Sequence, residues 1–353
     1  MISKKNIIIS LLLCISSTKL YSDIDIVSYG WELFDRLSDS RITSLAQATI
    51  AYPIASAGIS LVNPALSKVR NNKIGLTHQS RIAGMVNSEF LGFKKSVRDR
   101  HWGSVALLYE GINSIPDTRN VLLDWGNDGI FGTLDPGEGN GILDEGERLD
   151  VNKISYFSQN QFGLYGAFSR SYKRWELGLG IKLLFHTIDN HYALGTGINI
   201  GAYRSFNKTN LGIVLHNIPS SGLIWDNGNI ELTPGSLSIG AHHLLMMEKY
   251  GLEINPVCEA NFVMTDRTID SKLLFNIIPI ELSGGLETIY KRKIFIRLGF
   301  FQSGSLATGL GMFWKNITVD YAFIIDNSVT GIDNNHLITI GLSSDWIKDK
   351  VFN

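Results

Sequence analysis

The sequence predicts an all-β protein: an antiparallel transmembrane barrel of about fourteen strands, in the outer membrane of a diderm bacterium, with an N-terminal plug segment. Three observations predict this fold. The chain starts with a short export signal, and its residues alternate in polarity with a period of two from Ile74 onward. The connections that would lie at one end of the barrel are all short, whereas those at the other end include the long ones.

The first 22 residues have the layout of a secretory signal peptide. Two lysines precede an apolar run over residues 7–15, and the small Ser22 stands before Asp23, where we expect cleavage. The run is too short for a membrane helix, and no later stretch approaches the roughly 18 uninterrupted apolar residues that one needs. A lipid anchor at Cys14 is an alternative that Leu13 opposes, because lipoprotein processing needs a small residue before the cysteine.

Composition excludes several classes of protein. Cleavage after Ser22 leaves 29 basic against 33 acidic residues, a net charge of −4, which gives a nucleic-acid partner no electrostatic support. Cys258 then remains as the one cysteine, so we expect no internal disulfide and a buried thiol. A hydrophobic content of 44% with only 18% charged residues argues against disorder.

Alternation is clearest between Trp175 and Thr187, where odd positions are large and apolar while even positions include glycine, lysine and histidine. We therefore expect Leu179 to face lipid and Gly180 to face the lumen. Fourteen segments carry the pattern: residues 73–78, 85–93, 102–109, 161–168, 175–187, 192–200, 211–215, 237–241, 250–254, 278–282, 294–300, 306–314, 319–323 and 338–342. An even number places both termini on the periplasmic side.

Consecutive connections of an antiparallel barrel lie at alternate ends, so they divide into two groups. The short ones all contain lysine or arginine, and we assign them to the periplasmic side: 94–101, 169–174, 204–209, 245–249, 289–293 and 315–316. The opposite side carries long polar or acidic connections: 111–153, 217–235, 258–272 and 326–335. A soluble sandwich has no reason to sort its loops in this way, so the asymmetry favours the outer-membrane barrel.

Residues 23–69 do not alternate. Small and apolar residues surround Pro53 and Asn63-Pro64, which favours short helices and turns that fold into the lumen as a plug. We therefore expect a signal peptide over 1–22, a plug over 23–69, a barrel over 70–345 and a short tail over 346–353.

An acidic insert over residues 116–152 is the strongest local signal, and parity makes it extracellular. Its spacing resembles two incomplete copies of a calcium loop, with carboxylates near a glycine at the bend. The first copy places Asp124, Asp128 and Asp135 at positions 1, 5 and 12, and the second places Glu138, Asn140, Asp144 and Glu147 at positions 3, 5, 9 and 12. The insert is therefore a candidate calcium site, and the alternative is a solvated acidic loop.

Catalytic chemistry has no visible signal. The chain lacks G-x-S-x-G, H-E-x-x-H and Walker sequences, and its eight histidines are scattered without metal-ligand spacing. We therefore expect no enzyme.

The element Leu61-Val62-Asn63-Pro64-Ala65-Leu66, after an alanine-rich stretch, resembles the Asn-Pro-Ala-Gly-Leu element of the PorV/PorQ family of FadL-like outer-membrane proteins, with Leu66 in place of its glycine. Similarity continues in residues 211–219, 231–240, 319–323 and 334–336. The resemblance implies a fourteen-stranded barrel with a plug that contains Asn63, Pro64 and Ala65.

The resemblance also implies two alternative functions. The first is an accessory role in type IX-like protein secretion, with secreted clients or a translocon as partners. The alternative is a FadL-like channel for hydrophobic small molecules such as fatty acids. Outer-membrane lipids are partners in either case.

Overall fold

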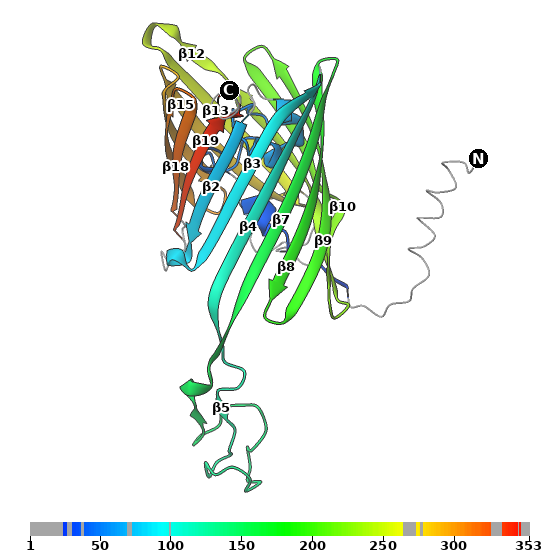
Figure 1. Ribbon diagram of the computed structural model, residues 1–353, viewed down its shortest axis with the longest axis vertical. Coiled ribbons are helices and arrows are strands. Elements are labelled where there is room, and N and C mark those ends of the chain that lie inside the picture. Colours follow the sequence, from blue (N-terminus) through cyan, green and yellow to red (C-terminus); the bar gives the residue numbers. More distant parts are fainter. Residues whose placement is uncertain are drawn as a thin grey trace, which may run out of the picture.

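The computed structural model describes residues 24–26, 30–36, 39–68, 73–98, 100–263, 273–275, 278–325, 334–344 and 346. These residues form a closed antiparallel barrel (Figure 1). Its strands are β2 (Lys73–Arg81), β3 (Val86–Arg98), β4 (His101–Asp117), β7 (Ser155–Tyr172), β8 (Trp175–Ile188), β9 (His191–Phe206), β10 (Thr209–Trp225), β11 (Ile230–His243), β13 (Leu252–Val263), β15 (Ile278–Tyr290), β16 (Ile294–Phe301), β17 (Leu306–Trp314), β18 (Ile317–Ile325) and β19 (Asn335–Ser343). Each strand pairs with the next and β19 pairs with β2, so the predicted fourteen-stranded barrel is confirmed.

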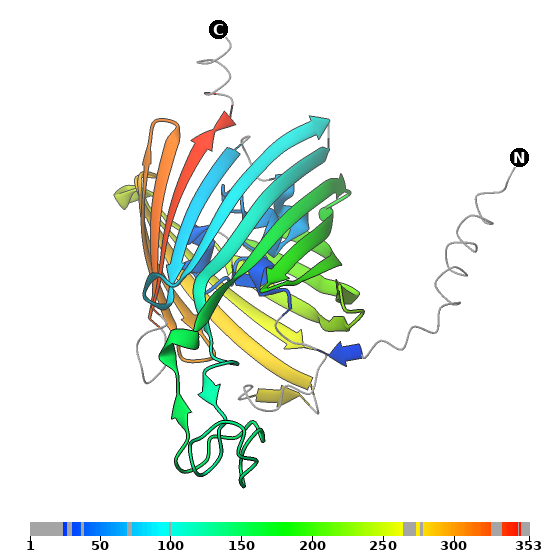
Figure 2. The same ribbon diagram turned by 60° about the horizontal axis from the view of Figure 1, so that its bottom comes forward.

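Short elements decorate this barrel. The strands are β1 (Ile24–Ile26) beside β11, β12 (Leu245–Met247) beside β13, β14 (Leu273–Phe275) beside β15, and the separate pair β5 (Leu122–Leu123) and β6 (Arg148–Leu149). Three 3-10 turns, η2 (Ile82–Gly84), η3 (Val151–Lys153) and η4 (Glu248–Tyr250), lie in connections. The acidic insert, with β5 and β6, projects from one end of the barrel (Figures 1 and 2).

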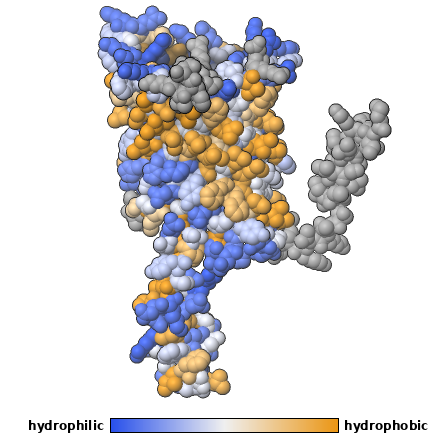
Figure 3. Space-filling model, viewed as in Figure 1, coloured by the Kyte–Doolittle hydropathy of each residue, from blue (hydrophilic) through white to orange (hydrophobic). Residues whose placement is uncertain are grey.

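The two faces of each strand differ as the alternation predicts. Leu179 is 44% exposed on the outside, whereas Gly180 is buried against the lumen. Outward leucine, isoleucine and phenylalanine side chains form an apolar band on the wall (Figure 3). Soluble proteins rarely expose so large an apolar area, so this band faces the hydrocarbon of a bilayer. The protein is an outer-membrane β-barrel.

Three expectations from the sequence are wrong. Residues 258–263 do not belong to a loop, because β13 continues to Val263. Residues 217–235 are not a long loop, because β10 continues to Trp225 and a turn over 226–229 leads directly into β11. Cys258 is not buried; it is exposed, because β13 directs its neighbour Val257 inward and the thiol therefore outward. Pairing with β11 at His216, Ser220 and Ser221 holds the irregular part of β10 in the wall.

The lumen is filled by residues 31–36 and 39–68, which include α2 (Glu32–Arg36), α3 (Ser40–Thr43), α4 (Ile59–Val62) and the 3-10 turn η1 (Pro64–Lys68). Most of their side chains are buried. In the described part of the chain, no helix is both long and apolar enough to span a membrane.

The Asn63-Pro64-Ala65 turn lies close to the wall. Asn63 Oδ1 accepts a hydrogen bond from the Ala65 N–H at 3.0 Å, and its Nδ2 donates to the Ile50 carbonyl at 2.8 Å. A Cβ added to Gly178 on β8 would overlap the Pro64–Ala65 backbone. Glycine is required there because the plug backbone approaches the wall without room for a side chain.

Candidate functional site

The interior between plug and wall has an apolar half. We call the following buried residues the apolar cluster: Trp31, Leu33 and Phe34 of the plug with Phe90, Leu108, Leu184 and Leu223 of the wall. Its wall residues come from β3, β4, β8 and β10, each of which places one large apolar side chain inward at this level of the barrel. Trp31, Leu33 and Phe34 pack on this wall through apolar contacts, and Asp35 adds the polar contact described below.

The other half is charged. Arg41 of α3 makes two hydrogen bonds of 2.7 Å to the Glu287 carboxylate on β15. Arg297 donates to Glu287 at 2.7 Å and to Asp320 at 2.6 Å, and Tyr52 donates to Glu287 at 2.5 Å. We call Arg41, Glu287, Arg297 and Asp320 the charge cluster. Two positive and two negative groups balance one another, which keeps these buried charges paired.

Asp39 begins α3 beside this cluster. Its side chain accepts a hydrogen bond from the Ile42 N–H at 3.0 Å and a second from the Ser56 hydroxyl. Burial raises the pKa of the Asp39 carboxyl to about 6. The plug is therefore fixed on its polar side by ionic and hydrogen-bonded contacts, whereas its other side packs on the apolar residues of the wall.

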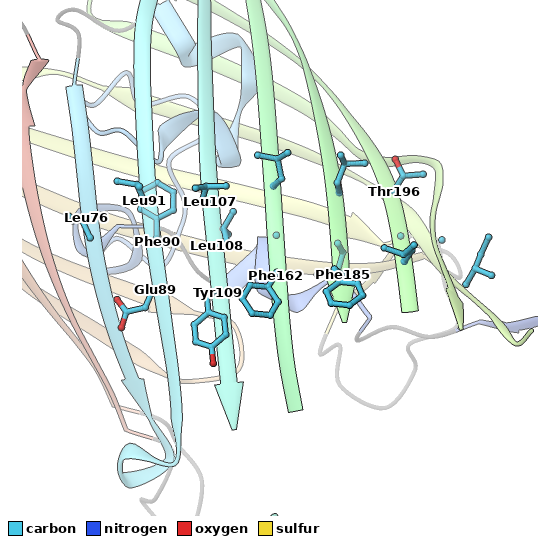
Figure 4. Close-up of a pocket in the computed structure, with 18 residues that line it drawn as sticks. Leu76, Glu89, Phe90, Leu91, Leu107, Leu108, Tyr109, Phe162, Phe185 and Thr196 are labelled. Carbon is cyan, nitrogen blue, oxygen red and sulfur yellow. The ribbon is translucent and has the colours of Figure 1, made fainter. Parts of the chain in front are cut away.

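A groove of about 770 Å³ runs across the outer face of the same apolar wall (Figure 4). Two rows of outward side chains border it: Glu89, Tyr109, Phe162, Phe185 and Leu194 in one row, and Leu76, Leu91, Leu107, Leu164, Leu183 and Thr196 in the other. The inward residues between these rows include Phe90, Leu108 and Leu184 of the apolar cluster. The outer groove and the apolar cluster therefore lie back to back across one wall.

The groove ends at the pair Thr196–Gly222, where the pairing of β9 with β10 is irregular. Between this pair and Ile200–Leu215, residues 216–221 of β10 face only residues 197–199 of β9. No regular ladder joins these described segments. The wall is thus interrupted at one place, next to both the groove and the apolar cluster.

Side chains close this interruption. Asn217 Oδ1 accepts hydrogen bonds from Lys182 Nζ at 3.0 Å and Ser221 Oγ at 2.8 Å, and the Asn217 N–H donates to Asn199 Oδ1 at 3.1 Å. We call these four residues the polar bridge; all of them are buried. Asn217 has a φ of 52°, a left-handed conformation that asparagine tolerates better than most residues.

The plug contacts the polar bridge directly. Asp35 of α2 lies 3.7 Å from Lys182 Nζ, which also lies 5.5 Å from the centre of the Phe34 ring. A displacement of α2 would remove both contacts and change the surroundings of Lys182. The one charged group of the polar bridge is therefore shared between the wall and α2 of the plug.

Most of the candidate calcium residues use their carboxylates to accept hydrogen bonds from backbone N–H groups of the insert. Asp124 accepts from the N–H groups of Gly139 and Gly141 at 2.7 Å each, which lowers the pKa of its carboxyl, chiefly through Gly141. The other carboxylates of the insert do the same: Asp128, Asp135, Glu138 and Glu147 accept from backbone amides, and Asp144 accepts from Asn140 Nδ2 at 2.6 Å. Among the described residues no three acidic, histidine or cysteine side chains gather around one point. As placed, these side chains do not fit a calcium ion, and calcium binding stays a prediction.

Neither the groove nor the polar bridge was predicted from the sequence. One signal was visible, since Lys182 is a charged residue on an inward face otherwise made of glycine, leucine and histidine. Its partner Asn217 lies 35 positions away, and only the register of the sheet brings the two together.

No protein-family model and no curated protein sequence matches the chain. Among solved structures, the toluene transporter TodX of Pseudomonas putida is similar at a TM-score of 0.50 and 11% identity, covering 91% of this chain and 98% of that one. A FadL homologue of Pseudomonas aeruginosa is similar at a TM-score of 0.49 and 10% identity, covering 86% and 97%. The structural neighbours are thus FadL-family outer-membrane barrels, and the likeness is one of fold.

Proposed function

We propose that the protein takes up hydrophobic small molecules into its lumen and releases them sideways, through the barrel wall, into the bilayer of the outer membrane. The observation that carries this proposal is the back-to-back placement of the apolar cluster and the outer groove beside the interrupted pairing of β9 and β10. The names of the similar structures agree with it, since TodX is described as a toluene transporter.

The physical argument concerns where an apolar molecule is stable. Such a molecule gains roughly 25 cal/mol for each Å² that it removes from water, so it favours the apolar cluster and the membrane interior over solvent. A groove of about 770 Å³ lies within the range that drug-sized ligands occupy. At the interruption the hydrogen bonds of the polar bridge take the place of a regular β9–β10 ladder among the described residues, and side-chain bonds rearrange more easily than a continuous ladder.

A disulfide across the interruption tests the route. A Cβ added at Gly197 would lie 3.1 Å from Ser221 Cβ, near the roughly 3.5 to 4.5 Å that a disulfide needs. In a Cys258→Ala background, Gly197→Cys/Ser221→Cys should lose uptake of radiolabelled toluene into proteoliposomes when oxidised and recover it when reduced. A matched control, Leu298→Cys/Thr308→Cys, joins an opposed pair on the far wall and should transport in either state. Equal uptake by the oxidised and reduced bridge variant would overturn the proposal.

A second candidate is the accessory role in protein secretion that the resemblance to PorV/PorQ implies. The observation that favours it is the projecting insert, whose Phe131 and Leu134 are 75% and 91% exposed. Exposed large apolar side chains on a protruding segment are typical of a surface that binds another protein. Replacement of residues 124–150 by a short glycine-serine linker should then change the set of secreted proteins while toluene uptake stays unchanged. A secretome identical to that of the wild type would exclude this role for the insert.

A further inference from the structure

A row of polar side chains borders the apolar cluster on the side nearer the insert. Gln79, Ser88, Glu110, Gln161 and His186 stand opposite one another on the consecutive strands β2, β3, β4, β7 and β8. All five lie on the inward face of the wall. Phe90, Leu108 and Leu184 of the apolar cluster lie on the same face, two residues further from the insert along their strands than Ser88, Glu110 and His186. We call these five residues, together with Arg81, the polar row.

Several polar atoms of this row have no hydrogen-bond partner. Glu110 is satisfied by the Arg81 guanidinium and by Ser88 Oγ at 2.8 Å, and His186 Nε2 lies 3.1 Å from Gln159 Nε2. Within the described part of the chain, however, Gln79 Oε1, Arg81 Nε, Gln161 Oε1 and His186 Nδ1 are buried without any partner. Buried polar groups are normally hydrogen-bonded, so four unpaired atoms along one row indicate a binding partner from outside the chain.

The polar row selects the chemistry of this partner. The unpaired glutamine atoms are carbonyl oxygens and require a donor, whereas Arg81 Nε is a donor and requires an acceptor. A hydroxyl group is both at once, whereas a protonated amine cannot accept and a carboxylate cannot donate. Glu110 and Glu231 outnumber the one arginine of this region, and Glu231 accepts from Trp225 Nε1 at 2.7 Å beside His186. The surroundings therefore repel a carboxylate.

We propose that the polar row binds the hydroxyl group of a hydrophobic alcohol or phenol whose apolar body lies against the apolar cluster. This inference rests on the proposed function, because the body of the ligand occupies the surface along which hydrophobic molecules would pass. It narrows the substrate class to apolar molecules with a terminal hydroxyl and disfavours their carboxylates.

Three ligands test the inference: toluene, 4-methylphenol and 4-methylbenzoate. They share a methyl-substituted ring and differ in the group opposite the methyl, which is a hydrogen, a hydroxyl or a carboxylate. Binding to the full-length barrel in lipid nanodiscs is measured by equilibrium dialysis. One hydrogen bond to a buried partner corresponds to about a tenfold difference in affinity, so 4-methylphenol should bind about ten times more tightly than toluene, and 4-methylbenzoate should bind most weakly.

Gln161→Leu should remove the preference for 4-methylphenol over toluene. The control is Asn160→Leu on the neighbouring outward position, where Asn160 Oδ1 accepts from the Tyr109 hydroxyl at 2.8 Å; it should keep the preference. Heat-modifiable gel mobility reports that both variants are folded. Equal affinities for the phenol and toluene, or a preference that survives in Gln161→Leu, would overturn the inference and mean that water satisfies the row. Toluene uptake is a separate readout: uptake without selectivity refutes only this inference, whereas selective binding without uptake refutes only the proposed function.

Discussion

Arg297 is the residue on which the charge cluster depends, because it contacts both acidic members and its side chain is fully buried. Arg297→Met would leave Glu287 with Arg41 and Tyr52, and would remove from Asp320 its ion pair with Arg297. Removing one partner of a buried ion pair costs about 3 to 5 kcal/mol, so we expect a corresponding loss in the free energy of unfolding. Urea titration of the heat-modifiable gel band measures it.

The control for this variant is Arg292→Met. Arg292 also pairs with a carboxylate, Glu253, at 3.1 Å, but its side chain is 81% exposed. Exposed pairs contribute about 0 to 1 kcal/mol, so the midpoint should hardly move. Equal destabilisation by both substitutions would mean that burial does not govern the contribution of these arginines.

Leu179 tests the facing of the wall. It lies on the outer face in the middle of β8, so Leu179→Arg should destabilise the folded barrel in lipid by roughly 2 to 4 kcal/mol. Thr187→Arg, on the same face near the end of the strand, should cost roughly 0 to 1 kcal/mol because the charge reaches the interface. Refolding titrations into liposomes provide the comparison, and similar costs at both positions would show that Leu179 does not lie at the membrane midplane.

At the scale of the element, β8 and β10 show what a sequence can and cannot predict. β8 was predicted with its facing because every outward residue from Leu177 to Phe185 is large and apolar. β10 looked like a loop after Leu215, because Pro219 and a run of small polar residues hide the alternation. Its continuation depends on pairing with β9 and β11, which are distant in sequence.

The candidate sites differ in the same way: local patterns are visible in the sequence, whereas contacts between distant strands are not. Asp124 and its neighbours were visible as a local acidic pattern, but their actual contacts are with backbone amides, which composition cannot show. The polar bridge and the polar row consist of single residues spread over several strands. Their assembly depends on the register of the sheet, which alternation alone leaves undetermined.

The insert should lose its internal order in acid. Its Asp124 carboxyl has a lowered pKa because it accepts hydrogen bonds from Gly141 and Gly139. A lowered pKa means that the ionised form is bound more strongly in the folded loop, so the stabilisation is complete above the ordinary value of 3.8 and is lost as the pH falls below it. Hydrogen exchange at these two amides, corrected for the intrinsic effect of pH, should show constant protection from pH 7 to 5 and loss in stronger acid. Asp124→Asn should show no such transition; if it shows the same one, another group is responsible.

Calcium should order the same insert. From Asp124 to Asp150 the segment holds eight acidic residues and one basic residue, a net charge of −7, so its carboxylates repel one another. A divalent ion would relieve this repulsion, with an affinity of about 10⁻⁴ to 10⁻³ M for a weak, partly hydrated site, once some carboxylates turn away from the backbone amides. Calcium titration should therefore protect the insert from protease in the wild type and not in Asp128→Ala/Asn140→Ala/Glu147→Ala. If both proteins are cut equally fast with and without calcium, the insert is a solvated acidic loop.

At the scale of the whole molecule, the plug is held unequally by the two halves of the lumen. The charge cluster and Asp39 fix the part around α3, whereas α2 contacts the opposite wall through apolar residues and the Asp35–Lys182 pair. Apolar contacts are non-directional, so a hydrophobic molecule can replace them without leaving a polar group unpaired. The division predicts that α2 moves during passage while α3 stays in place.

The whole protein should be exported, cleaved and inserted as one outer-membrane unit. The predicted signal peptide lies outside the described residues, so its test is chemical: N-terminal sequencing of the mature protein should begin at Asp23. A lipidated alternative would begin at Cys14 and incorporate labelled palmitate. The mature protein should sediment with the outer membrane and migrate faster on gels when it is not boiled, because the closed barrel resists unfolding by detergent at low temperature. Recovery as a soluble periplasmic protein would contradict the apolar band on its wall, since that surface needs lipid to cover it.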